Sequence, residues 1–278
     1  MLRTLVMALC VAVVALACPA LAQPASPPAT VILASTTSVE NSGLLKAILP
    51  SFTGTTGINV RVVAEGTGQA LDSARRGDAD LVLVHDPEAE QKFVADGNGI
   101  DRRQVAWNDF IVVGPSADPA KIDNSNNAVA GFTAIANAKA TFVSRGDRSG
   151  TNEMELRLWQ AAGIDPKGGA GSWYRDIGGG MGQALNAAAA MPGYTLSDRG
   201  TWLSFKNKGP LVIALQGDPR LINRYDVIEL NPVEHPSAQL TAARRFADWL
   251  VSPQGQAAIG KYQVNGEQLF HPSAASPR

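Results

Sequence analysis

Short apolar runs alternate along the first part of the chain with segments whose apolar residues recur at helical spacing. The run Val-Ile-Leu-Ala at residues 31–34 has no polar alternation, which is typical of a strand buried on both faces. Residues 44–52 place apolar side chains every three to four positions, which predicts a helix. The same order recurs at residues 58–77 and from residue 79 onward. Three such units in succession predict a parallel sheet with helices on both faces.

The second part of the chain predicts another lobe. Residues 105–115 form a longer and more mixed apolar run, which we expect to pass from one lobe into the other. Strands and helices then alternate again, and a last strand near residues 226–231 is expected to return the chain to the first lobe. The pattern predicts an α/β protein with lobes at 30–110 plus 229–270 and at 111–228. Two crossing strands would join these lobes and leave a cleft between them.

One polar loop separates a strand from a helix in the second part of the chain. It reads Ser144-Arg145-Gly146-Asp147-Arg148-Ser149-Gly150-Thr151. Unpaired backbone N–H groups at a helix start carry partial positive charge, and an arginine donates from a planar fork, so such a loop can hold an oxyanion. The alternative is that Ser149 or Thr151 only caps the helix while both arginines are solvated.

Further hydroxyl, glycine and arginine residues follow other predicted strands. The segments are Ser35-Thr36-Thr37-Ser38, Gly66-Thr67-Gly68 and Ser197-Asp198-Arg199. Each of them is also compatible with a plain turn. Because ligand sites of parallel sheets lie beyond the carboxyl ends of the strands, we expect these segments to form one oxyanion site with the loop at residues 144–151. His85 ends the third strand, and we interpret it as structural.

The amino terminus has the pattern of a secretory signal peptide. Residues 1–22 combine a basic start, an apolar core and the small-residue site Ala20-Leu21-Ala22, which predicts cleavage before Gln23. The residues before Cys18 form a poor lipobox, so a lipoprotein is the less favoured alternative. Both cysteines, Cys10 and Cys18, lie in this segment, and a mature chain without thiols excludes disulfides and cysteine-dependent chemistry.

Composition narrows the chemistry further. The formal net charge is -1 and no basic cluster occurs, so a nucleic-acid partner is not expected. His85, His235 and His271 lack zinc-ligand spacing, so neither a metal nor another cofactor is expected. No histidine lies near Ser149 in the sequence and no Gly-x-Ser-x-Gly elbow occurs, so we expect a binding protein rather than an enzyme.

The residues alone leave the identity of the anion open. A fully ionised dianion such as sulfate, molybdate or tungstate needs only donors, whereas protonated phosphate also needs a carboxylate acceptor. Asp147 and Asp198 lie within the candidate segments, so phosphate is not excluded. Ionic radius selects among the tetrahedral dianions, and the sequence does not reveal the radius of the site.

Most of the chain after the signal segment resembles the Tup-type tungstate-binding proteins, which are periplasmic solute receptors of an ABC importer. The matching segments are Ser35-Thr36-Thr37-Ser38, Ser42-Gly43-Leu44-Leu45, Gly66-Thr67-Gly68-Gln69-Ala70-Leu71, residues 77–85, Asn108-Asp109-Phe110, residues 142–151 and residues 194–201. Arg145 with Ser149-Gly150-Thr151 is also similar to the anion loop of phosphate receptors, which are more distant relatives.

The resemblance implies a two-lobe periplasmic-binding-protein fold of type II that closes on an oxyanion. The site residues that it implies are Thr36, Thr37, Ser38 and Thr67 in the first lobe and Arg145, Ser149, Gly150 and Thr151 in the second, with Arg199 as a further charge or a support. The family motif usually reads Thr-Thr-Thr-Ser, and Ser35 keeps a hydroxyl at its first position. Asn152 stands where a histidine is common, which leaves the role of that position open.

We therefore expect a monomeric periplasmic receptor that binds tungstate or molybdate without transforming it and docks on a membrane permease. A phosphate or sulfate receptor is the alternative within this class of protein. The alternative outside the class is a phosphate-handling hydrolase that uses Asp147 or Asp198 as its base.

Overall fold

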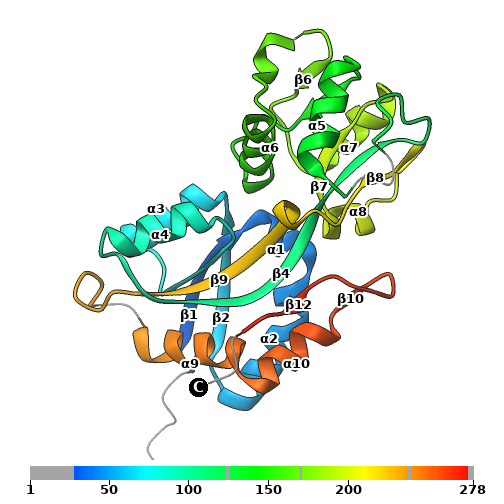
Figure 1. Cartoon of the computed structure of the whole chain (residues 1–278). Helices are drawn as coiled ribbons and strands as arrows, with labels where there is room; N and C mark the ends of the chain where they lie inside the picture. Colours follow the sequence, from blue (N-terminus) through cyan, green and yellow to red (C-terminus); the bar gives the residue numbers. More distant parts are fainter. Residues whose placement is uncertain (1–27, 123–125, 170, 237–238, 275–278) are drawn as a thin grey trace, which may run out of the picture.

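The computed structural model describes residues 28–122, 126–169, 171–236 and 239–274. It has two α/β lobes, and the long strand β4 (Gly99–Pro115) passes from one to the other (Figure 1). Within these ranges no helix is long and apolar enough to cross a bilayer. The predicted signal peptide at residues 1–22 lies outside the described residues.

The first lobe is built from strand–helix units in the predicted order. Its strands are β1 (Thr30–Thr36), β2 (Asn59–Glu65) and β3 (Leu81–Val84), and its helices are α1 (Thr37–Ser42), α2 (Leu44–Thr56), α3 (Thr67–Arg75), α4 (Pro87–Ala95), α9 (Leu240–Val251) and α10 (Pro253–Lys261). Helix α4 begins as its sequence predicts, because Asp86 accepts from the N–H groups of Glu88 and Ala89 and Pro87 fills the first turn.

The sheet of the first lobe is only partly parallel. The strands β2, β1 and β3 are parallel neighbours, which confirms the prediction for this part. Strand β9 (Ile222–Leu230), which brings the chain back to this lobe, pairs antiparallel with both β3 and β4, so the complete sheet is mixed. The physical reason is the path of the chain. Strand β4 leaves the lobe in the same direction as β1, so the strand that comes back must run in the opposite direction.

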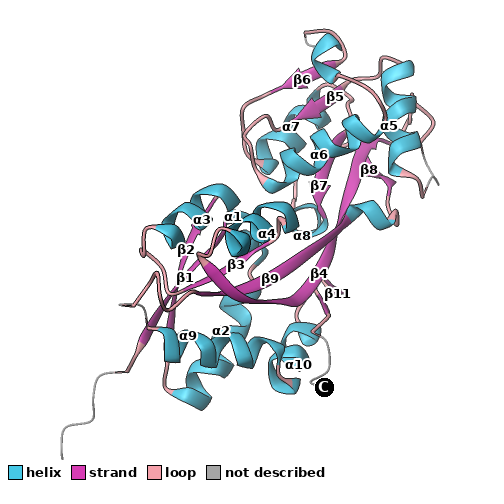
Figure 2. Ribbon diagram, turned by 60° about the vertical axis from the view of Figure 1, so that its left-hand side comes forward, coloured by secondary structure: helices cyan, strands magenta, loops and turns pink. Residues whose placement is uncertain are grey.

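The second lobe carries its own small sheets and helices (Figure 2). Its elements are α5 (Ala128–Asn137), β5 (Phe142–Ser144), α6 (Gly150–Ala161), η1 (Pro166–Gly169), β6 (Tyr174–Asp176), α7 (Met181–Ala190), β7 (Thr195–Asp198), α8 (Arg199–Ser204), β8 (Leu211–Leu215) and η2 (Pro219–Leu221). The far half of β4 pairs with β7 and β8. After α10, β10 (Gln263–Val264) and β11 (Glu267–Gln268) pair with each other, and β12 (His271–Pro272) pairs with β4.

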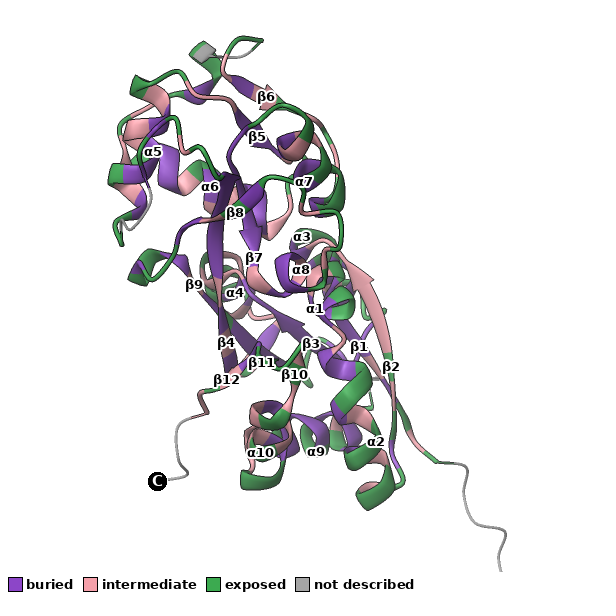
Figure 3. Cartoon of the chain, turned by 90° about the vertical axis from the view of Figure 1, so that its right-hand side faces the viewer, coloured by how far each residue is buried: buried purple, intermediate pink, exposed green. Residues whose placement is uncertain are grey.

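Each lobe has apolar cores of its own. One cluster of the first lobe packs Leu33 of β1 against Phe52 of α2 and Phe246 of α9, and one cluster of the second lobe packs Phe132 against Trp159. Figure 3 shows the strands mostly buried and the outer faces of α2 and α10 exposed. Separate cores joined by two crossing segments are the architecture that the apolar pattern predicts. The lobe boundaries at 30–110, 229–270 and 111–228 stay a prediction.

Candidate functional site

A small cavity of about 20 Å³ lies where the two lobes face each other. Its lining residues are Thr36, Thr37, Ser38, Glu65, Gly66, Thr67 and His85 from the first lobe and Arg145, Ser149, Gly150 and Thr151 from the second. A wider cavity of about 490 Å³ adjoins it and shares Thr37, Gly66, Arg145 and Ser149. Eight of the nine predicted site residues therefore meet in one place, and Arg199 does not.

The first wall of the cavity is the corner between β1 and α1. Thr36 ends the strand and caps the helix, since its Oγ1 accepts from the N–H of Val39 at 3.3 Å. Ser38 lies 3.0 Å from the Thr36 hydroxyl. Ser35 faces away and donates to the Leu83 carbonyl at 2.8 Å, which ties β1 to β3. The four consecutive hydroxyls thus divide into one that holds the sheet and three that reach the cavity.

The start of helix α3 adds a second group of first-lobe donors. Thr67 is the first residue of the helix, and its Oγ1 is buried without a hydrogen-bond partner among the described residues. Gly66 precedes it in extended conformation and donates its N–H to Gln69 at 3.2 Å. A buried hydroxyl without a partner costs free energy unless a ligand satisfies it. Thr67 therefore has the environment of a ligand donor.

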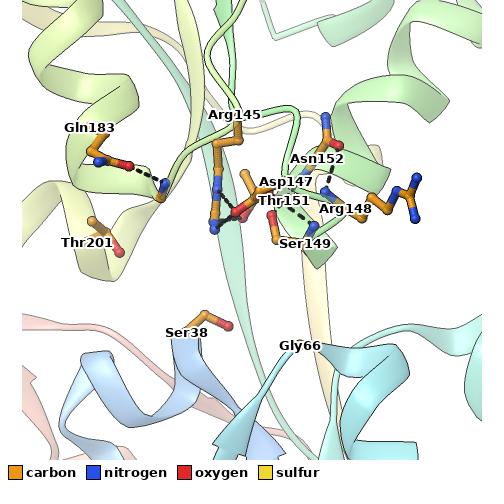
Figure 4. A network of polar contacts seen from close by, with 12 residues as sticks. Ser38, Gly66, Arg145, Asp147, Arg148, Ser149, Thr151, Asn152, Gln183 and Thr201 are labelled. Carbon is orange, nitrogen blue, oxygen red and sulfur yellow. Dashed lines mark hydrogen bonds and ion pairs between the residues drawn. The ribbon is translucent and has the colours of Figure 1, made fainter. Parts of the chain in front are cut away.

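The second wall is the polar loop between β5 and α6, and it carries the positive charge of the cavity. Nε and Nη2 of Arg145 both donate to one carboxylate oxygen of Asp147, and its Nη1 lies 3.4 Å from the Thr151 hydroxyl (Figure 4). The other oxygen of Asp147 accepts from the N–H of Ser149 at 3.1 Å. Burial alone would raise the pKa of Asp147, but the Ser149 hydrogen bonds and the Arg145 charge outweigh it and hold that pKa below its usual value.

Asn152 supports the loop from the first turn of α6. Its Oδ1 accepts from the N–H of Arg148 at 3.2 Å, and its Nδ2 donates to the Ser144 hydroxyl at 3.2 Å. Arg148 has a φ of +57°, a left-handed conformation that is held here by this hydrogen bond. Ser149 caps the helix by accepting from the N–H of Asn152 at 3.3 Å. Asn152, whose role the resemblance leaves open, therefore supports the loop.

A buried carboxylate, Glu155, holds the base of the same loop. It accepts from Ser144 at 2.7 Å, from Tyr174 at 2.8 Å and from Trp159 at 3.1 Å. Burial raises its pKa to about 7, against the lowering effect of these donors. The sequence analysis missed Glu155, because it lies on a helix among other polar residues and nothing local shows that it points into the core.

Arg199 lies outside the cavity, at the start of α8. Its guanidinium donates with Nε and Nη2 to the two oxygens of Asp109, each at 2.6 Å, and with Nη2 to Gln216 at 2.9 Å. This paired hydrogen bond raises the pKa of Arg199. The contact joins α8 to the middle of β4, where that strand passes between the lobes. A direct role of Arg199 in anion binding stays a prediction.

Three cavity residues, Glu65, Gly66 and His85, were not among the nine predicted site residues, although Gly66 belongs to a segment that the sequence analysis placed at the site. Glu65 ends β2, and its Oε2 accepts from the Ser73 hydroxyl at 2.8 Å. His85 follows β3, is 7% exposed, and places Nε2 2.9 Å from the Ser38 hydroxyl. Both follow the rule that strand ends line the site, which is the signal that could have identified them.

The two lobes also touch beside the cavity. Nη2 of Arg157 on α6 lies 3.1 Å and 3.2 Å from the two carboxylate oxygens of Asp86, which caps α4 in the first lobe. His85 packs against Gly150, where an added Cβ would lie 2.7 Å from the ring. These contacts bring the first turn of α6 close to the end of β3.

The cavity offers many donors and little catalytic machinery. The described residues contain no cluster of three metal-ligating side chains. Ser38 and His85 form a nucleophile–base contact, but Nδ1 of His85 has no carboxylate or other partner within the described chain to orient the ring. Hydroxyls, helix-start N–H groups and one arginine are instead the groups that bind a small oxyanion.

Comparison with known proteins supports the same class of function. A family model described as the PBP superfamily domain matches residues 22–254. The chain is 45% identical over 250 residues to the tungstate-binding protein TupA of Peptoclostridium acidaminophilum, covering 88% of this chain and 86% of the relative. It is 37% identical over 237 residues to the tungstate-binding protein TupA of Campylobacter jejuni, covering 84% and 87%.

Solved structures show the same similarity in the fold. The tungstate-binding protein TupA from Desulfovibrio alaskensis superposes with a TM-score of 0.81 at 40% identity, covering 89% of this chain and 100% of that chain. The structure described as the tungstate ABC transporter from Geobacter sulfurreducens gives a TM-score of 0.75 at 43% identity, covering 84% and 98%.

Proposed function

The chain belongs to the family of TupA tungstate-binding proteins within the PBP superfamily, and from this membership we propose that it captures tungstate in the periplasm for an ABC importer. The resemblance and the two-lobe periplasmic-binding fold predicted from the sequence are confirmed by these relatives. As a solute-binding component of a transporter the protein is not an enzyme, which sets aside the hydrolase alternative.

One observation carries the proposal for this chain. Hydroxyls from both lobes and a single arginine converge on one cavity between the lobes, and the hydroxyl of Thr67 is buried there without a partner among the described residues. Hydrogen bonds to a charged group contribute about 1.5–3 kcal/mol each, so about six of them offset much of the cost of removing a dianion from water. The ligand would join Arg145 of one lobe to Thr36 of the other.

The environment of the carboxylates favours a fully ionised dianion. Asp147 is engaged by Arg145 and Ser149. Asp198 does not line the cavity, since it caps α8 by accepting from the N–H and the hydroxyl of Thr201, each at 2.7 Å. Neither of the acceptors considered from the sequence is therefore available to a protonated anion, which supports tungstate or molybdate over phosphate.

Calorimetric titration of the mature protein with tungstate, molybdate, sulfate and phosphate tests the proposal. We expect tight binding of tungstate, weaker binding of molybdate and negligible heat from sulfate and phosphate at one pH and salt concentration. Binding of phosphate alone would overturn the proposed ligand and keep the receptor class. If none of the four anions binds, the proposal that the protein is an oxyanion receptor is wrong.

Phosphate is included in the titration because Glu65 could accept a hydrogen bond from its protonated form. It is the carboxylate among the described residues that line the small cavity, and a protonated phosphate would need such an acceptor. If phosphate binds, Glu65→Gln should abolish that binding. If tungstate is the ligand, the same change removes a repulsive charge and should leave tungstate binding equal or tighter.

The proposal also covers where the protein is located and which partner it docks on. Residues 1–22 would direct the chain to the periplasm as a cleaved signal peptide, and a lipid anchor at Cys18 is the alternative. Mass spectrometry of the secreted protein distinguishes the two, because cleavage before Gln23 leaves no cysteine in the product.

We further propose that the mature protein is a monomer that docks on a membrane permease. Light scattering of the purified protein tests whether it is a monomer.

A further inference from the structure

The hydroxyl of Ser38 lies between two polar neighbours in the cavity wall. On one side Nε2 of His85 is 2.9 Å away, and on the other the Thr36 hydroxyl is 3.0 Å away. Thr36 already accepts from the N–H of Val39. All three side chains, Thr36, Ser38 and His85, line the same cavity. The direction of these hydrogen bonds decides which proton is left for an anion.

A count of protons gives two possible arrangements. If Nε2 of His85 accepts, the Ser38 hydroxyl donates to the imidazole and the Thr36 hydroxyl must donate to Ser38. Neither hydroxyl can then donate to a ligand. If Nε2 carries the proton and donates, one hydroxyl proton serves the contact between Thr36 and Ser38 and the other is free. Only the second arrangement leaves the Ser38–Thr36 pair with a hydroxyl proton for an anion.

The surroundings of the ring favour the second arrangement. Nδ1 of His85 is buried and has no hydrogen-bond partner among the described residues. A proton on Nδ1 would be a buried donor without an acceptor, and orphaned N–H donors are rarer in proteins than under-satisfied acceptors. Burial is the largest effect on His85 and lowers its pKa, although the charge of Asp198, the nearby Asn223 side chain and the charge of Asp86 all favour the charged ring, so the neutral ring carries its single proton on one nitrogen.

The ring is also held in place from both lobes. The Tyr225 ring packs on it with centroids 5.0 Å apart, and Gly150 of the second lobe leaves no room for a Cβ beside it. A ring fixed in this way presents the same nitrogen to Ser38 throughout.

We propose that His85 is a positioning residue for anion binding, which donates from Nε2 to Ser38 and thereby directs a hydroxyl proton of the Ser38–Thr36 pair into the cavity. The inference rests on the proposed oxyanion-binding function. When the Ser38 oxygen accepts a hydrogen bond from His85, the Ser38 O–H is also polarised and becomes a stronger donor.

A double-mutant cycle with sodium tungstate tests the inference. Dissociation constants are measured by calorimetry for the wild type, His85→Leu, Ser38→Ala and the double variant. We expect His85→Leu to weaken tungstate binding about tenfold when Ser38 is present and less than about twofold in the Ser38→Ala background. An equal loss in both backgrounds would assign His85 to packing alone. Tighter binding by His85→Leu would show that His85 accepts from Ser38, and either result overturns the proposal.

The variant His85→Gln is the matched control. Its side-chain amide can donate to Ser38 from a position near that of Nε2, so we expect an affinity within about threefold of the wild type. A loss as large as that of His85→Leu would contradict the positioning role. Circular dichroism melting of each ligand-free variant separates loss of fold from loss of binding. If the wild type binds no tungstate, the proposed function fails; if it binds and the cycle shows no coupling, only this inference fails.

Discussion

The two walls of the cavity are built on different physical principles. The first-lobe wall contributes mainly neutral hydroxyl groups, such as Thr36 at the end of β1 at 3% exposure and Thr67 at the start of α3 at 8%, together with the carboxylate of Glu65. The second-lobe wall contributes the charge of Arg145, which is carried on a loop and already neutralised by Asp147. The first wall can be buried without a large desolvation cost because it has no charged donor, whereas the second requires a counter-ion near its arginine.

This difference assigns different tasks to the two walls. Groups on strand ends are held by the sheet, so the first wall sets the positions of donors around the anion. Arg145 donates to Asp147 in the structure, so an anion must compete with Asp147 for its donors. We therefore expect changes in the second wall to act mainly on affinity through charge, and changes in the first wall to act through geometry.

The largest effect should follow from removing the charge of the second wall. Arg145→Ala should weaken tungstate binding by at least about a hundredfold, because two hydrogen bonds to a charged group are worth about 1.5–3 kcal/mol each. The melting temperature of the ligand-free protein should stay within about 3 °C, because the partner Asp147 is partly exposed and such pairs contribute little. Calorimetry and thermal melting measure the two quantities, and normal binding by this variant would make the loop purely structural.

A smaller loss should follow from changing the first wall. Thr67→Val keeps the volume but removes the unpartnered hydroxyl, so tungstate binding should weaken about tenfold while the ligand-free protein keeps or gains stability. Ser35→Ala is the matched control, since its hydroxyl bonds to the Leu83 carbonyl. That change should lower the free energy of unfolding by about 1–2 kcal/mol and leave affinity unchanged. The reverse pattern would exchange the roles of the two residues.

A modest gain should follow from weakening the internal counter-ion. Asp147→Asn can still accept from the N–H of Ser149 but no longer neutralises Arg145, so tungstate should bind roughly threefold to tenfold more tightly. The gain should shrink as salt is added, because the residue is partly exposed. A titration series at two salt concentrations measures both effects. Weaker binding would mean that Asp147 shapes the loop more than it competes with the ligand.

The smallest effect on affinity is expected from Glu155, which acts on stability. Its pKa is raised to about 7 from 4.5, so the folded protein holds a proton that the unfolded chain releases at lower pH. The resulting stabilisation is complete below about pH 4.5, falls as the pH rises and is gone above about pH 7. Glu155→Gln should therefore flatten the fall in stability between pH 5 and pH 8, measured by denaturant unfolding. An unchanged slope relative to wild type would contradict the raised pKa.

Much of the site could be predicted because strand ends are visible in the sequence. The hydroxyls after β1, the threonine that opens α3 and the loop before α6 each follow an apolar run, and all of them line the cavity. The residues that were missed, Glu65, His85 and Glu155, are single polar side chains, and the only local signal is the strand-end position of Glu65 and His85. Their importance depends on partners far away in the chain, such as Ser38 for His85 and Tyr174 for Glu155.

The sequence by itself determined the two α/β lobes, the order of strands and helices and the class of ligand, because apolar periodicity and helix-start chemistry act between residues close in the chain. Only the tertiary structure decided which of several similar groups face the cavity. Ser35 and Thr36 are adjacent hydroxyls, yet one bonds β3 and the other lines the site. Arg145 and Arg199 both lie near helix starts, yet Asp109 holds Arg199 beside the crossing strand. Such choices depend on contacts between segments far apart in the chain, which no local pattern encodes.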